Sequence, residues 1–272
     1  MNKQIIFTVG YTLFQNGNYV DLEKMFNVLR NYNVTYLVDV RSVPYSKQYP
    51  QCNADNLKIA GKRYGIPYLH MPEIGAKVSA EQDVFSKASD IFFNDIFPIP
   101  KSNRPEKTEL FKDDEIVDFN KFRNDEYFLK GLKRIETAYE KDFTLCLMCS
   151  EKSPVDCHRY FLISKALEKK FGDWLGVQHI VQGDNGTIST SSNSELNNQL
   201  KELIFKKKEI KKLVNEPSSD LFNQSMDIPA VIDTYYGETR SDREADFCDR
   251  YWNLMHGWKK NVCNIKNSHD YD

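Results

Sequence analysis

The sequence predicts an α/β fold: a mostly parallel, Rossmann-like sheet of five strands with helices on both faces, plus a helical C-terminal appendage. Along the first two thirds of the chain, short apolar runs rich in β-branched residues alternate with segments whose apolar residues have helical spacing. The runs are nearly continuous rather than alternating apolar and polar, which is typical of strands covered on both faces. Parallel strands of this kind are joined by right-handed crossovers.

The predicted strands and helices follow one another in a regular order. The first strand, Gln4–Val9, ends at the turn Gly10-Tyr11-Thr12 and leads into a helix over Tyr19–Asn31. The second strand, Val34–Val40, is followed by a helix over Ala54–Tyr64. Three further strands are expected at Ile66–Met71, Phe143–Met148 and Val177–Val181, and two further helices at Tyr127–Tyr139 and Tyr160–Lys170.

The composition divides the chain into an α/β domain, a linker and a tail. We expect the α/β domain to span residues 1–183, with an insertion over about 76–125 that contains three prolines and a charged run. A connection of this length is either a functional lid or a plain insertion. Residues 184–200 are rich in Ser, Asn, Gly and Thr, which is typical of a linker, and residues 201–272 form a helical tail rich in lysine and aromatic residues.

The charge of the chain restricts how it could bind nucleic acid. With 37 Lys and Arg against 39 Asp and Glu, the net charge is −2, so any affinity for DNA or RNA must come from a local patch. A helix over Glu202–Val214 offers such a patch, although a lysine-rich face is also typical of a solvated surface. The candidate patch, with DNA as the favoured polymer, consists of Lys206, Lys207, Lys208, Lys211 and Lys212.

The remaining composition indicates a cytoplasmic protein that is not embedded in a membrane. The N-terminal residues lead directly into a strand without the apolar core of a signal peptide, and no segment approaches the ~18 apolar residues of a membrane span. The six cysteines have no regular spacing and fit a reducing compartment. Nothing in the sequence indicates an oligomeric state.

Unusual residues gather where the predicted strands end. In a parallel sheet, ligands bind outside the carboxyl ends of the strands, so these residues are expected to form one basin. Each also has an ordinary structural role to offer, such as capping a turn or pairing a charge, and only their coincidence favours a site. The candidate residues are Gly10, Tyr11, Thr12, Asp39, Arg41, Ser42, His70, Glu73, Cys149, Glu151, Cys157, His158 and Arg159.

The motifs TVGYT, LVDVRSVP, IPYLHMPEIG and LMCSEKSPVDCHR, followed by a helix and a VQHI strand, stand in an order that resembles the bacterial family called domain of unknown function 488 (DUF488). The resemblance covers about Ile5–Val181 and leaves the tail outside. Tyr11-Thr12 stands where the family more commonly has His-Ser, and Ile74-Gly75-Ala76 where it more commonly has Leu-Gly-Gly. The resemblance implies functional positions at Gly10, Asp39, Arg41, Ser42, His70, Glu73, Gly75, Cys149, Glu151, Cys157, His158 and Arg159.

The basin is compatible with several kinds of chemistry. We favour an enzyme acting at the N-glycosidic bond of a nucleotide or of DNA, with phosphate bound at Gly10–Thr12 and Arg159. Asp39 and Glu73 would then stabilise an oxocarbenium-like state, with His70 or His158 as the proton donor.

Three alternatives remain. The first is rhodanese-like sulfur chemistry with Cys149 as a low-pKa nucleophile, and the second is a non-catalytic nucleic-acid-binding module. The third is a zinc site at Cys149, Cys157 and His158, which lacks a fourth ligand, so no metal or other cofactor is expected.

Overall fold

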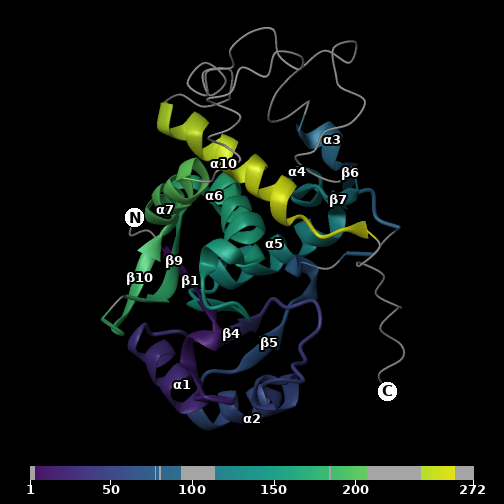
Figure 1. Ribbon diagram of the computed structural model, residues 1–272. Helices are drawn as coiled ribbons and strands as arrows, with labels where there is room; N and C mark the ends of the chain where they lie inside the picture. Colours follow the sequence, from purple (N-terminus) through teal and green to yellow (C-terminus); the bar gives the residue numbers. More distant parts are fainter. Residues whose placement is uncertain are drawn as a thin grey trace, which may run out of the picture. The chain divides into compact units, whose positions relative to one another are not determined.

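The computed structural model describes residues 4–76, 78–79, 81–92, 114–183, 185–206 and 240–260 (Figure 1). The chain forms two compact units. The first comprises Met1–Lys77 and Arg123–Leu196, and the second comprises Val78–Phe122 and Asn197–Asp272. Within the described residues, no helix is long and apolar enough to cross a membrane.

The first unit is built on a mixed, mostly parallel sheet of six strands in the order β10-β9-β1-β8-β4-β5. All neighbouring strands are parallel except β10, which is antiparallel to β9. The five predicted strand positions are confirmed, but the number five is wrong because a sixth strand follows them. The strands are β1 Gln4–Gly10, β4 Tyr36–Asp39, β5 Tyr68–His70, β8 Leu145–Cys149, β9 Leu175–Gln182 and β10 Ile188–Ser192.

The sixth strand also corrects the expected linker. Ile188–Ser192 pairs with β9, and Asn193–Lys206 forms helix α7, so residues 185–200 are largely regular structure. The Ser and Thr residues that suggested a linker suit an edge strand, where side chains meet solvent. Composition alone therefore did not distinguish a polar edge strand from a loop.

The helices of the first unit cover both faces of the sheet (Figure 1). Helices α1 and α2 bury Met25, Phe26 and Leu57 in one cluster with Phe7 and Val9 of β1. The helices α5 and α6 lie on the other side of the sheet (Figure 1). The bounds are α1 Leu22–Asn31, α2 Ala54–Tyr64, α5 Glu126–Glu140 and α6 Lys165–Phe171, with short helices η1 Tyr11–Phe14, η2 Pro50–Cys52, η3 Pro72–Ile74, η6 Pro154–Asp156, the π-helical η7 Arg159–Ser164 and η8 Gly172–Trp174.

The first helix starts later than its apolar spacing predicts. Tyr19–Val20 forms strand β3, which pairs with β2 at Gln15–Asn16, and the helix begins at Leu22. The carboxylate of Asp21 accepts a hydrogen bond from the backbone N–H of Lys24 at 2.9 Å and so caps the helix N-terminus.

The second unit combines the insertion with the tail. Its elements are β6 Phe85–Lys87, α3 Ala88–Asp90, β7 Glu115–Val117, α4 Phe119–Phe122, most of α7, and α10 Arg240–His256. The side chain of Asn253 on α10 donates to the carbonyl of Val117 at 2.8 Å and accepts from the N–H of Phe119 at 3.0 Å. The tail is thus bound to the insertion. The side chains of the predicted lysine patch, from Lys206 to Lys212, lie outside the described residues.

A buried polar chain holds β9 against β1 and α7. The imidazole of His179 is fully buried, with Nδ1 at 2.7 Å from the hydroxyl of Thr8 and Nε2 at 2.6 Å from the side-chain oxygen of Asn193. The amide oxygen can only accept, so Nε2 carries the hydrogen and Nδ1 accepts from Thr8. Burial lowers the pKa of His179 to about 3, and the charge of Arg159 acts in the same direction.

We therefore expect His179 to make the fold sensitive to acid. The unfolded chain binds the proton more strongly than the folded one, so stability is complete above a pH of about 6.5 and falls as the pH drops from there toward about 3. At about pH 5 the loss attributable to this residue is about 2 kcal/mol. Urea unfolding at about pH 7.5 and about pH 5 should show a smaller acid loss in His179→Gln than in the wild type. Equal losses in both proteins would contradict this assignment.

Candidate functional site

The candidate site lies at the carboxyl end of β8, between β1 and β4. Gly10 at the end of β1 is in register with Cys149 at the end of β8, and Asp39 at the end of β4 is in register with Met148. The chain leaves β1 and β4 toward α1 and α2 on one face, whereas it leaves β8 toward α6 on the other face (Figure 1). In α/β sheets, such a divergence of connections marks the usual position of a ligand site.

A buried arginine holds the loop that follows β8. Arg159 is 0% exposed, and its two terminal nitrogens donate to the carbonyls of Glu151 at 2.6 Å and Lys152 at 3.0 Å. The hydroxyl of Thr12 donates to the carbonyl of Ser150 at 2.5 Å. The loop is thereby pressed onto Gly10, where a Cβ atom would overlap the carbonyl oxygen of Glu151. Arg159 was expected to bind phosphate. In the structure, its terminal nitrogens bind backbone carbonyls of the loop.

Four side chains converge where this loop begins and ends. The thiols of Cys149 and Cys157 donate to the same oxygen of Glu151, Oε2, at 2.9 Å and 3.0 Å. Nδ1 of His158 lies 3.6 Å from the sulfur of Cys149 and 3.8 Å from that of Cys157. One donor atom from each of the four residues lies within 4.8 Å of the other three. Glu151 is exposed as a residue, although its carboxylate is partly covered where it meets the two sulfurs, and the other three residues are buried.

The ring of His158 has a fixed orientation. Its Nε2 lies 3.1 Å from the carbonyl oxygen of Val40, which can only accept, so Nε2 carries a hydrogen. In the neutral ring, the lone pair is therefore on Nδ1 and faces the two sulfurs. A hydrogen bond from the far ring nitrogen to a backbone carbonyl is the arrangement that commonly orients a metal-binding histidine.

The four groups shift one another's pKa in opposite directions. Burial raises the pKa of the Cys149 thiol well above its usual value, and hydrogen bonding with Cys157 raises it further. Burial also acts to raise the pKa of Cys157, but its hydrogen bond with Cys149 and the nearby charge of Arg159 lower it overall. Burial opposes ionisation of Glu151, yet the bonds from both thiols lower its pKa to about 2. For His158, burial favours the neutral ring, but the charge of Cys157 raises the pKa overall.

The thiol whose pKa is lowered is that of Cys157 and not that of Cys149. The rhodanese-like alternative requires a low-pKa thiol at Cys149, and the surroundings of Cys149 raise its pKa, whereas those of Cys157 lower the pKa of that thiol. The reason is position: Cys149 is still in the buried strand, whereas Cys157 lies close to both Arg159 and His158.

Asp39 and Arg41 form a buried ion pair, and the oxygens of the Asp39 carboxylate are already occupied by hydrogen bonds. The carboxylate of Asp39 is 0% exposed and accepts from the backbone N–H of Arg41 at 3.0 Å and from its guanidinium at 2.9 Å and 2.5 Å. It also accepts from the hydroxyl of Tyr68 at 2.7 Å. Burial opposes the charge of Arg41, but the hydrogen bond and charge of Asp39 raise its pKa overall. The guanidinium stacks over the ring of Tyr11 at 5.2 Å.

The other predicted site residues support the same region. Nε2 of His70 lies 2.8 Å from the carbonyl of Arg41, and Glu73 forms an ion pair with Arg134 of α5. A Cβ at Gly75 would lie 2.6 Å from the hydroxyl oxygen of Ser42, so glycine lets these two loops approach each other. Thus only Cys149, Glu151, Cys157 and His158 bring reactive atoms together. The sequence did not indicate Tyr68, Arg134 or the carbonyl of Val40, because such partners carry no motif.

Comparison with known proteins supports the resemblance over part of the chain. The family model described as "Domain of unknown function DUF488" matches residues 21–97. This range contains Asp39, Arg41, Ser42, His70, Glu73 and Gly75, and ends before the loop of Cys149 to Arg159. The resemblance to DUF488 is therefore confirmed over residues 21–97. No curated protein and no solved structure matches the chain.

Replacing Gly10 should disrupt the site through the backbone. In Gly10→Ala, the added methyl group would overlap the Glu151 carbonyl and lie 3.1 Å from a terminal nitrogen of Arg159. We expect a loss of at least about 3 kcal/mol in the free energy of unfolding, measured in urea, because the loop must move off a buried arginine. The matched control is Gly183→Ala, where the nearest heavy atom is at 3.4 Å, and it should unfold as the wild type does. Equal stability of the two variants would show that the loop is not held as described.

Proposed function

We propose that the chain is a zinc-dependent hydrolytic enzyme whose metal is bound by Cys149, Cys157, His158 and, in the resting state, Glu151. The observation that supports this proposal is the convergence of the four donor atoms within 4.8 Å. Thiolate, imidazole and carboxylate are the ligands that zinc takes in proteins, usually four in a tetrahedron. Two thiolates also make the site a poor one for magnesium or calcium, which prefer oxygen.

The two sulfur–nitrogen distances agree with such a centre, whereas the two sulfur–oxygen distances are shorter than a bound ion would allow. With zinc bonds of about 2.3 Å to sulfur and about 2.0 Å to nitrogen or oxygen, neighbouring donors in a tetrahedron lie about 3.3–3.8 Å apart. The two sulfur–nitrogen distances, 3.6 Å and 3.8 Å, fall in this range. Oε2 of Glu151 lies at 2.9 Å and 3.0 Å from the sulfurs, so this carboxylate would move outward by about 0.5 Å to admit the ion.

The difference in burial among the ligands favours a catalytic rather than a structural metal. Structural zinc sites are closed, whereas catalytic ones keep three protein ligands and one exchangeable position. Cys149, Cys157 and His158 are buried, and Glu151 is exposed. The backbone of Glu151 is held by Arg159, so its side chain can leave the metal without a change of fold. The vacated position would take a water whose pKa the metal lowers to about 7, with Glu151 beside it as the general base.

We propose a nucleobase-containing substrate, such as a nucleotide or a base in DNA. Zinc nucleobase deaminases use the same residue types: two cysteines and a histidine bind the metal, and a glutamate acts as general acid and base. Hydrolysis at the N-glycosidic bond is the second candidate. It is less favoured, because each of its two carboxylates already has an arginine partner: Asp39 pairs with Arg41 and Glu73 with Arg134.

Rhodanese-like sulfur transfer has less support. It requires a thiolate at Cys149, and burial together with hydrogen bonding raises the pKa of that thiol. A thiol that stays protonated is a weak nucleophile. In the zinc proposal, both sulfurs are ligands and neither attacks the substrate.

The metal itself is the first test. The full chain, purified without chelators, should contain one zinc per molecule by elemental analysis, and cobalt in its place should give the absorption of a tetrahedral thiolate site. Cys149→Ser and Cys157→Ser should each lose the metal, since a hydroxyl is a far weaker zinc ligand. Cys146→Ala, on the same strand and equally buried, should keep it. A metal-free wild type that does not take up added zinc would contradict the proposal.

The second test concerns Glu151. Glu151→Gln should keep the zinc and lower the rate by about 100-fold or more, because the amide cannot accept the proton of the metal-bound water. Asp156→Asn, an exposed change in the same loop, should be as active as the wild type. The assays are release of ammonia and release of free base from nucleosides, nucleotides and single-stranded DNA. Activity that survives Glu151→Gln and Cys157→Ser but falls in Glu73→Gln would instead favour the N-glycosidic mechanism.

A further inference from the structure

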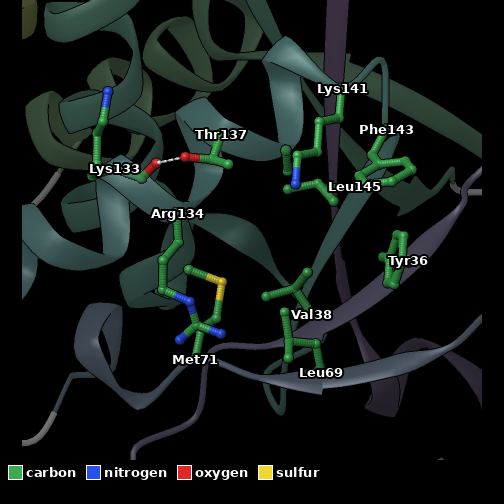
Figure 2. A pocket seen from close by; sticks show the side chains of 11 residues that line it. Tyr36, Val38, Leu69, Met71, Lys133, Arg134, Thr137, Lys141, Phe143 and Leu145 are labelled. Carbon is green, nitrogen blue, oxygen red and sulfur yellow. Dashed lines mark hydrogen bonds between the residues drawn. The ribbon is translucent and has the colours of Figure 1, made fainter.

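A pocket lies in the first unit, on the face of the sheet that α5 covers. Its volume is about 320 Å³, and its lining comes from β4, β5 and β8 on one side and from the end of α5 on the other (Figure 2). It shares no residue with the candidate metal centre. A pocket of this size is at the small end of the range that binds small molecules.

The floor of the pocket is apolar. Val38 of β4 and Leu145 of β8 lie at its centre, and the rings of Tyr36 and Phe143 pack edge to face with centroids 4.9 Å apart (Figure 2). Two floor residues are unusually exposed for a sheet face opposite a helix, Leu69 at 40% and Phe143 at 37%. Apolar side chains left open in this way favour a ligand with an apolar body.

The sequence of α5 explains why the pocket is open. The pocket is lined by residues spaced i, i+3, i+4 and i+7 at the end of α5, namely Arg134, Thr137, Ala138 and the C-cap residue Lys141. This spacing usually presents leucine or a similar residue to a core. Here it presents small and charged residues, so the last turns of the helix do not fill the space above the strands. Earlier in the same helix, Phe128, Leu132 and Ile135 are buried in the ordinary way.

One positive charge at the pocket is uncompensated. Arg134 is paired with Glu73, and Lys133 is paired with Glu136. Within the described part of the chain, the ammonium group of Lys141 has no carboxylate partner, and Figure 2 shows its side chain pointing into the pocket. A cation over an apolar floor favours a ligand with one negative group.

We propose that this pocket binds a small molecule with a compact apolar body and one anionic group, a monocarboxylate in the simplest case. The body lies on Val38, Leu69, Phe143 and Leu145, and the carboxylate pairs with Lys141. An aromatic body would stack on the Tyr36–Phe143 pair, and a medium-chain aliphatic body would fill the same floor. This binding site is independent of the metal centre and does not require the proposed enzyme activity.

Calorimetric titration of the full chain with 2-naphthoate, decanoate and the uncharged 2-naphthalenemethanol tests the proposal. We expect at least one carboxylate to bind about threefold more tightly than the alcohol, the effect of one ion pair with an exposed lysine. Lys141→Met keeps the length of the side chain but removes its charge, and it should abolish this preference. The matched control is Lys169→Met on α6, an exposed lysine outside the pocket lining, and it should bind as the wild type does.

A variant with a larger side chain in the lining distinguishes binding in the pocket from binding elsewhere on the surface. Ala138→Leu restores the usual core residue and should abolish binding of all three probes without lowering the melting temperature. If Ala138→Leu unfolds, Thr137→Leu adds bulk to the same lining and should weaken binding. The proposal is overturned if the wild type binds none of the probes at millimolar concentration, if the alcohol binds as tightly as the carboxylates, or if Lys141→Met and Lys169→Met behave alike.

Discussion

A buried arginine, which has no carboxylate partner within the described part of the chain, organises the strand ends of the first unit. The guanidinium of Arg159 is removed from water, which is costly unless its hydrogens are bound. The two terminal nitrogens offset part of that cost by donating to the carbonyls of Glu151 and Lys152, whereas Nε has no partner among the described residues. These two carbonyls belong to the loop after β8, which folds over Gly10. The burial of Arg159, the position of the loop after β8 and the glycine at position 10 therefore depend on one another. Because the cluster of Cys149 to His158 begins and ends in this loop, its geometry depends on the same set.

A second buried charge, Arg41, controls the neighbouring strand end. Its guanidinium is neutralised by Asp39, and its carbonyl meets the ring of His70. The carbonyl of the preceding residue, Val40, meets the ring of His158. Consecutive peptide groups thus orient two histidines, His70 at the end of β5 and His158 in the segment after β8. The ion pair is better understood as the part that fixes these carbonyls than as a pair of reacting groups.

How far the sequence predicts the structure depends on the kind of information involved. Apolar runs such as Val34–Val40 locate the parallel strands, since burial on both faces demands apolar residues. The strand β10 escapes prediction because a polar edge strand has the composition of a loop. At the site, the residue types were predicted and their partners were not. Glu151 was recognised as a strand-end residue, but only the folded loop brings its carboxylate to the two sulfurs as a fourth donor. Asp39 was predicted to be catalytic, and the sequence did not indicate that its carboxylate accepts hydrogen bonds from Arg41 and Tyr68.

The hydrogen bonds between Asn253 and the insertion also bear on the order in which the protein can fold. Asn253 and the carbonyl it binds at Val117 are separated by 136 positions in the chain. The hairpin of β6 and β7 therefore leaves the ribosome long before α10 exists to bind it. All strands of the six-stranded sheet, by contrast, are synthesised before α10. The sheet can be completed while synthesis continues, and the second unit has to wait for α10.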